Sequence, residues 1–151
     1  EVDNNIALPS LKDRLSRRGF IDREKVNTLA ERMVKMLDIR LYRTSQLAES
    51  LSGGNQQKVV LGKWLSMDPV LLLLDEPTRG IDVSAKAEIY KLLEVLASTG
   101  VAILVASSEM QEVLGIADRI VVMCEGRITG ELDPEKCSEE DIIKLATESA
   151  V

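Results

Sequence analysis

The spacing of apolar residues changes near residue 68 of the chain. Before that point, apolar positions recur at helical intervals. They predict a helix over residues 23–37 with one buried face, made by Val26, Leu29, Ala30, Met33 and Leu37. A short helix is expected after Ser10, which would cap it, with Gly19 as its stop, and a longer helix from Ser52 to about Met67. The first part of the chain is therefore expected to be helical.

After Asp68 and Pro69, which end that helix, strands and helices alternate. The run "VLLLLD" is apolar on every residue before its aspartate, which predicts a strand over residues 70–74 that is covered on both faces. The remaining elements are expected in this order: a helix over residues 84–98, a strand ending at Ala106, a helix over residues 109–114, the strand "RIVVM", a turn at Glu125 and Gly126, the strand "RITGEL", and a helix capped by Ser138. Long crossovers between strands predict a parallel α/β sheet.

Composition and charge narrow the classes of function. A chain of 151 residues suits one domain with a substantial core. The net charge is −6, and basic residues outnumber acidic ones only in residues 1–43, by ten to seven. This local basic excess favours a solvated helical face over a surface that binds nucleic acid. The chain has no histidine, which excludes most imidazole catalysis and most zinc sites.

The number of cysteines and the length of the apolar runs indicate the cellular environment in which the protein works. The two cysteines, Cys124 and Cys137, fit reduced thiols in an intracellular protein better than a disulfide framework. No apolar run reaches the roughly 18 to 20 residues that a membrane helix requires. The sequence begins "EVDNN" without an initiator methionine, and we therefore expect a processed or excised piece of a longer protein.

Carboxylates gather where the apolar strand ends. In "LLLLDEPTRGID", Asp75 and Glu76 follow the strand directly, and Asp82 comes just after. The carboxyl edge of a parallel sheet is where α/β folds place their ligands. Acids and prolines also commonly begin a loop after a strand, so the pair alone supports either reading.

The stretch "LSGGNQQK" places two glycines at the start of a helix. One explanation is mechanical: a loop enters a helix and Ser52 caps it. Another is chemical: a serine hydroxyl, glycine amides and the positive end of a helix together form a seat for an anion.

The order of these motifs resembles the ATP-binding subunit of ATP-binding cassette transporters. The resemblance implies a P-loop NTPase-type α/β fold, with a helical subdomain over residues 1–67 and the C-terminal part of the ATPase core over residues 68–151. In this family, "LSGGNQQK" is the signature motif. The resemblance implies that this motif contacts the γ-phosphate of ATP held by a second cassette in a head-to-tail dimer. The signature residues expected to contact this nucleotide are Leu51, Ser52, Gly53, Gly54, Asn55 and Gln56.

The resemblance also gives roles to the carboxylates. Asp75 would hold Mg²⁺, partly through water. Glu76 would orient or deprotonate the attacking water. Asp82 would belong to the D-loop, the stretch "TRGID" beside the nucleotide. Most cassettes carry a switch histidine where this chain has Ser108. A hydroxyl cannot carry the charge of an imidazolium, so the site built on these carboxylates is expected to hydrolyse ATP poorly.

With Asn55 in the signature, the sequence is similar to the second cassette of importers for ribose, galactose, xylose and related sugars. That resemblance implies a second cassette, membrane permease subunits and a sugar-binding protein as partners, and a cytoplasmic location on the inner face of the membrane. The phosphate loop G-x-x-x-x-G-K-[ST] is absent, because the only "GK", at Gly62 and Lys63, lacks the motif's other residues. We therefore expect a truncated cassette that does not hydrolyse ATP by itself.

Two other functions remain open at this stage. One is an ATPase of the same superfamily in DNA repair or translation, which the acidic charge and the "GNQQK" variant disfavour. The other is a cassette-fold domain that has lost catalysis and acts only through its surfaces.

Overall fold

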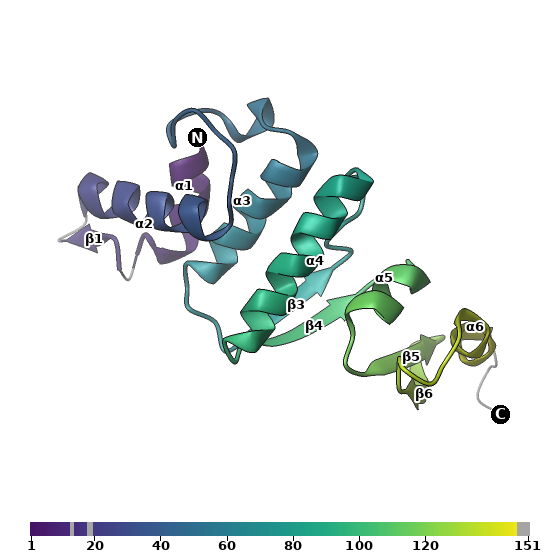
Figure 1. Ribbon diagram of the computed structural model, residues 1–151. Helices are drawn as coiled ribbons and strands as arrows, with labels where there is room; N and C mark the ends of the chain where they lie inside the picture. The colour runs from purple at the N-terminus through teal and green to yellow at the C-terminus, as the bar shows by residue number, and fades with distance from the viewer. Residues whose placement is uncertain (13, 18–19, 148–151) are drawn as a thin grey trace. The chain divides into compact units, whose positions relative to one another are not determined.

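The computed structural model describes residues 1–12, 14–17 and 20–147 (Figure 1). The chain divides into two compact units, Glu1–Leu104 and Val105–Val151, and each is described by itself. The expected subdomains over residues 1–67 and 68–151 remain a prediction. No helix in the part of the chain that the structure describes is long and apolar enough to cross a bilayer.

Three helices form the core of the first unit: α1 (Val2–Ala7), α2 (Arg23–Met36) and α3 (Gly53–Leu65). Helix α1 packs against both of the others. The side chains between them are apolar and almost inaccessible to solvent, among them Val2, Ile6, Val26, Ala30, Met33 and Leu61. Asp22 caps α2 by accepting a hydrogen bond from the Lys25 amide at 3.2 Å. The helix expected over residues 23–37 is confirmed.

The expected short helix after Ser10 is wrong. The chain instead begins with α1 and the 3₁₀ helix η1 (Leu8–Ser10), and then forms a small antiparallel pair, β1 (Ser16–Arg17) with β2 (Phe20–Ile21). The buried Ser10 hydroxyl contacts the Ser66 carbonyl oxygen at 3.4 Å and is therefore not used as a helix cap. Gly19, the expected stop, lies outside the described residues.

Strand β3 (Leu71–Asp75) of the first unit is the neighbour of β4 (Ala102–Ala106), whose first three residues belong to that unit. Helix α4 (Val83–Ser98) joins them, as the crossover of a parallel pair requires. The expectation that β3 is covered on both faces is wrong for this chain. Leu72 is buried, whereas Leu71 and Leu73 on the opposite face are 50% and 65% exposed. The chain itself covers only one face of this strand.

The second unit is a hairpin with two helices. It contains α5 (Met110–Ile116), β5 (Ile120–Cys124), β6 (Arg127–Leu132) and α6 (Glu139–Thr147), and α6 packs on both strands. Strands β5 and β6 pair antiparallel across Glu125 and Gly126, whose φ angles of 48° and 78° suit a two-residue hairpin turn. Ser138 caps α6 by accepting a hydrogen bond from the Asp141 amide at 3.3 Å. The expected hairpin and closing helix are confirmed.

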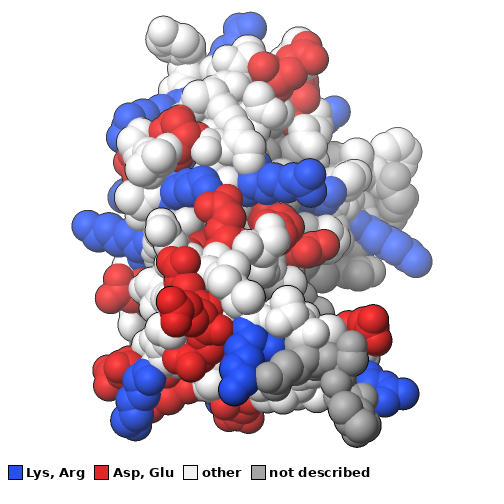
Figure 2. Space-filling model, turned by 90° about the vertical axis from the view of Figure 1, so that its right-hand side faces the viewer, with Lys and Arg blue, Asp and Glu red and all other residues white. Residues whose placement is uncertain are grey.

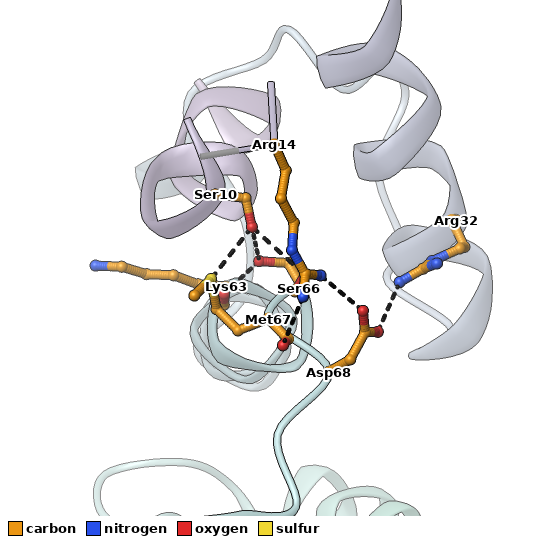
Figure 3. A network of polar contacts seen from close by, with 7 residues as sticks. All are labelled: Ser10, Arg14, Arg32, Lys63, Ser66, Met67 and Asp68. Atoms are coloured by element: carbon orange, nitrogen blue, oxygen red, sulfur yellow. Dashed lines mark hydrogen bonds and ion pairs between the residues drawn. The ribbon is translucent and has the colours of Figure 1, made fainter. Parts of the chain in front are cut away.

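A polar network ties the end of α3 to the N-terminal segments (Figure 3). The Asp68 carboxylate, just beyond the helix, pairs with Arg14 at 2.7 Å and with Arg32 of α2 at 3.3 Å. The hydrogen bond from Arg14, assisted by the charges of both arginines, holds the pKa of Asp68 below its ordinary value. Asp68 also adopts a φ of 52°, so it both turns the chain and anchors it.

The Asp68 network generates a pH-dependent prediction. Asn tolerates positive φ, so Asp68→Asn removes the charge while keeping the turn. Since the side chain is 60% exposed, we expect the free energy of unfolding at pH 7 to fall by only about 0.5–1 kcal/mol. Folding lowers this pKa, so the difference from wild type is present above about pH 4 and disappears as the pH falls through the folded-state pKa.

Urea unfolding at pH 7 and at pH 3 measures this difference. Asp118→Asn serves as a matched control, because Asp118 is an exposed aspartate outside the network. A difference that grows on acidification would contradict the assignment.

Candidate functional site

Helix α3 begins inside the signature motif. Ser52 occupies the N-cap position with extended backbone angles, φ −61° and ψ 155°, but its side chain makes no capping hydrogen bond. Its hydroxyl oxygen instead accepts a hydrogen bond from Asn55 Nδ2 at 2.9 Å. Ser52 thus takes the N-cap position where a loop enters the helix, as the mechanical explanation expects, but the expected capping by its side chain is wrong. Ser52 and Gly53 are both exposed, and the amides of the first turn are not covered by a capping side chain.

The two glycines of the signature have different environments. A Cβ built on Gly54 would lie 2.6 Å from the Ala85 Cβ of α4, which is closer than real Cβ contacts. A Cβ on Gly53 would meet Ile81 Cγ2 at 3.5 Å, which is an ordinary contact. Gly54 is thus needed for the close packing of α3 on α4. The fold leaves room for a side chain at Gly53, so packing within this chain does not require glycine there.

The other two expected signature residues support the loop. Leu51 is largely buried, and its carbonyl accepts a hydrogen bond from Gln56 Nε2 at 2.8 Å. This bond closes the turn around Ser52 and ties the Gln56 side chain to the residue just before the N-cap of α3.

The strand carboxylates lie at the end of β3. Asp75 is the last residue of the strand and is exposed, and Glu76 follows it with a φ of 47°. A glutamate in this left-handed region is uncommon, and such residues cluster at functional sites. The following turn is held by a hydrogen bond from the Arg79 amide to the Glu76 carbonyl at 3.2 Å, over the buried Pro77 and Thr78.

Asp82 caps helix α4. Its carboxylate accepts hydrogen bonds from Ser84 Oγ at 2.6 Å and from the Ala85 amide at 2.9 Å. These bonds, that from Ser84 foremost, hold the pKa of Asp82 below its ordinary value. Because Ala85 also packs against Gly54, this capped helix end places the loop after β3 beside the signature.

A charged cluster lies between α3 and α4 and was not predicted from the sequence. Lys58 of the signature helix is only 5% exposed, and its ammonium donates to Glu88 Oε2 at 2.9 Å and to the Asp38 carbonyl at 3.0 Å. Glu88 also pairs with Arg40 at 3.1 Å. The hydrogen bond from Lys58, with the charges of Lys58 and Arg40, lowers the pKa of Glu88. A lysine on the buried face of "NQQKVVLGKWL" was the signal that could have indicated a partner.

Ser108 belongs to the second unit, in the loop between β4 and α5, and is exposed. Its neighbour Ser107 is hydrogen-bonded to the buried Glu112 carboxylate, and the Ser107 hydroxyl accepts from the Glu109 amide at 3.1 Å. Hydrogen bonds within the second unit therefore hold the loop that carries Ser108.

The carboxylates at the end of β3 could bind Mg²⁺ only together with oxygen ligands from water or phosphate. Among the described residues, no group of three or more Cys, Asp or Glu side chains could hold a metal by itself. Mg²⁺ is commonly bound by one or two carboxylates together with water and substrate phosphates. Asp75, exposed at the strand end, fits that mode and could supply one oxygen ligand.

The different surroundings of Gly53 and Gly54 predict that alanine at the two positions changes the stability of the protein by different amounts. Gly54→Ala should lower the free energy of unfolding by about 1–3 kcal/mol, because the added methyl overlaps Ala85 and neither helix can move freely. Gly53→Ala, the matched control in the same turn, should stay within about 0.5 kcal/mol of wild type. Chemical denaturation of the two variants compares them. Equal destabilisation would show that the close approach of α3 and α4 is not the constraint at Gly54.

Comparisons with known proteins agree with the fold and the motif order. A solved ATP-binding cassette of an ABC transporter, MJ1267, superposes with a TM-score of 0.79 at 21% identity, covering 97% of this chain and 62% of that one. The dimeric post-hydrolysis structure of the cassette MJ0796 bound to ADP and Pi matches with a TM-score of 0.72 at 25% identity, covering 88% of this chain and 56% of that one. The α/β cassette fold is thereby confirmed, in part of its length.

Curated relatives are closer in sequence. A putative ribose/galactose/methyl galactoside import ATP-binding protein of Rhizobium etli is 51% identical over 97% of this chain, and one of Burkholderia ambifaria is 53% identical over 98%. The ribose import ATP-binding protein RbsA of Streptococcus agalactiae is 48% identical over 97%. The chain spans only 28% to 30% of the length of these relatives.

A family profile described as ABC transporter matches residues 2–79, the stretch that holds the signature and the strand carboxylates. This match covers 78 of the 151 residues. The chain belongs to the ABC transporter family.

Proposed function

We propose that this chain is part of the ATP-hydrolysing subunit of an importer for a monosaccharide of the ribose or galactose type. The support for the substrate class is the import proteins that are about half identical to nearly all of this sequence. The support for a contribution to ATP hydrolysis is the motif order and the shared cassette fold.

Within that subunit, the signature edge contacts the terminal phosphate of ATP held by a second cassette. The observation that carries this assignment is the exposure of Ser52 and Gly53 at an uncapped helix start, beside a Gly54 that is buried for packing. Backbone amides at a helix N-terminus attract anions, and a glycine lets a phosphate approach them. A related cassette is known as a dimer bound to ADP and Pi, which supplies a precedent for the second cassette.

The strand carboxylates serve the nucleotide that this cassette's own core would hold. ATP with Mg²⁺ supplies the phosphoryl group that is transferred to water. Asp75 would ligate the metal, Glu76 would orient or deprotonate the water, and Asp82 would keep the D-loop in place through its cap on α4. Ser108 would stand at the position of the switch histidine, so this site would hydrolyse ATP slowly.

The proposed partners follow from an importer. They are a second cassette, membrane permease subunits and, through the permease, a sugar-binding protein, with this subunit on the cytoplasmic side of the membrane. A nucleic-acid-associated ATPase of the same superfamily is the alternative. On the face drawn in Figure 2, acidic side chains lie between the basic ones, so that face gives the alternative no support.

Two substitutions in a full-length import ATPase that carries this segment separate the roles of signature and strand. Ser52→Arg should abolish most ATP turnover, because a long side chain would stand where the partner's phosphate approaches. Glu76→Gln should leave nucleotide binding intact and reduce turnover less, since its own site is the weaker one. Steady-state ATPase rates and nucleotide-binding titrations measure both effects. Ser98→Arg, at an exposed serine near the end of α4, is the control for adding the side chain. The reverse order of damage would contradict the assignment.

The 151-residue chain alone should show no measurable ATP turnover and at most millimolar affinity for ATP. Its sequence contains no phosphate loop to cradle the nucleotide. Titration calorimetry with ATP and Mg²⁺ tests this expectation. Tight, magnesium-dependent binding would contradict it.

A further inference from the structure

Asn55 lies between the signature serine and a second loop. Its Oδ1 accepts a hydrogen bond from the Arg40 backbone amide at 2.8 Å, and its Nδ2 donates to Ser52 Oγ at 2.9 Å. A backbone N–H can only donate, so the Arg40 amide determines which end of the carboxamide faces it. The NH₂ group must then face Ser52.

This orientation has a consequence for the serine hydroxyl. An amide NH₂ group can only donate, so Ser52 Oγ is the acceptor in its bond with Asn55. The hydroxyl hydrogen is not used in that bond and remains available for another acceptor. Ser52 is exposed at the N-cap of α3, so this hydrogen can be donated to a group that comes from outside.

The Arg40 amide is itself held by two helices. The Lys58 ammonium of α3 donates to the Asp38 carbonyl at 3.0 Å, which fixes the start of the loop. Glu88 of α4 pairs with the Arg40 guanidinium at 3.1 Å and with Lys58 at 2.9 Å. Ile39, between the two anchored residues, is buried. The donor that orients Asn55 is therefore fixed by a buried charge and by tertiary packing.

We propose that Asn55 is a positioning residue that sets Ser52 as a hydrogen-bond donor toward an incoming phosphate. A terminal phosphate at neutral pH presents acceptor oxygens, so a serine that is held as a donor suits it and a serine turned to accept does not. Asn55 thereby acts through Ser52 and not by touching the nucleotide. The inference rests on the proposed contact between Ser52 and ATP of a partner cassette.

Asn55→Asp is the sharpest test, because it keeps the shape of the side chain and replaces the donor with a second acceptor oxygen. The carboxylate would take the Ser52 hydrogen and turn the hydroxyl away from the phosphate. In the full-length import ATPase, we expect kcat for ATP to fall about tenfold or more, as for loss of a hydrogen bond to a charged group. KM for ATP should change little, since the nucleotide is held by the other cassette.

Three further variants make the test specific. Asn27→Asp adds the same charge at an exposed asparagine of α2 and should leave turnover unchanged. Asn55→Ala removes the carboxamide without adding an acceptor, so kcat should fall by only about threefold, and it serves if the aspartate variant does not fold. In a Ser52→Ala background, Asn55→Asp should cause almost no further loss of kcat, because the hydroxyl through which it acts is gone.

ATP turnover of these variants distinguishes an error in the positioning role of Asn55 from an error in the phosphate contact of Ser52 on which it rests. If Ser52→Ala leaves ATP turnover unchanged, the proposed phosphate contact is wrong, and the role of Asn55 is wrong with it. If Ser52→Ala lowers turnover but Asn55→Asp does not, or if the two losses simply multiply in the double variant, only the positioning role is overturned. Non-multiplicative losses with an unchanged KM support it.

Discussion

The close approach of α3 to α4 at Gly54 and Ala85 is the constraint on which the arrangement of the site depends. No side chain larger than hydrogen fits at Gly54 without displacing one of the helices. That contact sets the signature beside the loop after β3, where Asp82 caps α4. The salt bridge from Lys58 to Glu88 holds the same two helices about one turn further along. Packing and charge therefore fix the edge that presents Ser52.

Much of the fold could be predicted from the sequence, because local signals were strong. The apolar periodicity predicted the position of α2. The turn at Glu125 and Gly126 indicated the β5–β6 hairpin, since glycine readily accepts the positive φ that Gly126 adopts. The site motifs were also recognisable from their order along the chain. The family match and the superposed cassettes confirm the family and fold but leave the roles of individual residues as proposals.

What could not be predicted depends on tertiary contacts. The start of the chain was assigned to the wrong helix because Ser10, a good cap by residue type, has its hydroxyl buried against Ser66, 56 positions away. The same limit applies to Asn55, whose orientation depends on the amide of Arg40, 15 residues earlier in the chain. A pattern of residue types cannot show which of several possible partners a polar side chain meets.

The open face of β3 links folding to the chemistry at its end. Leu71 and Leu73 are exposed on the strand that terminates in Asp75. Whatever segment covers these leucines would gain about 25 cal/mol for each Å² of apolar surface removed from water, and would brace the strand from its second side. If Asp75 ligates a metal as proposed, covering this face and immobilising the strand-end carboxylate would be coupled, so an ATPase in which β3 is poorly covered would lose stability and metal affinity together.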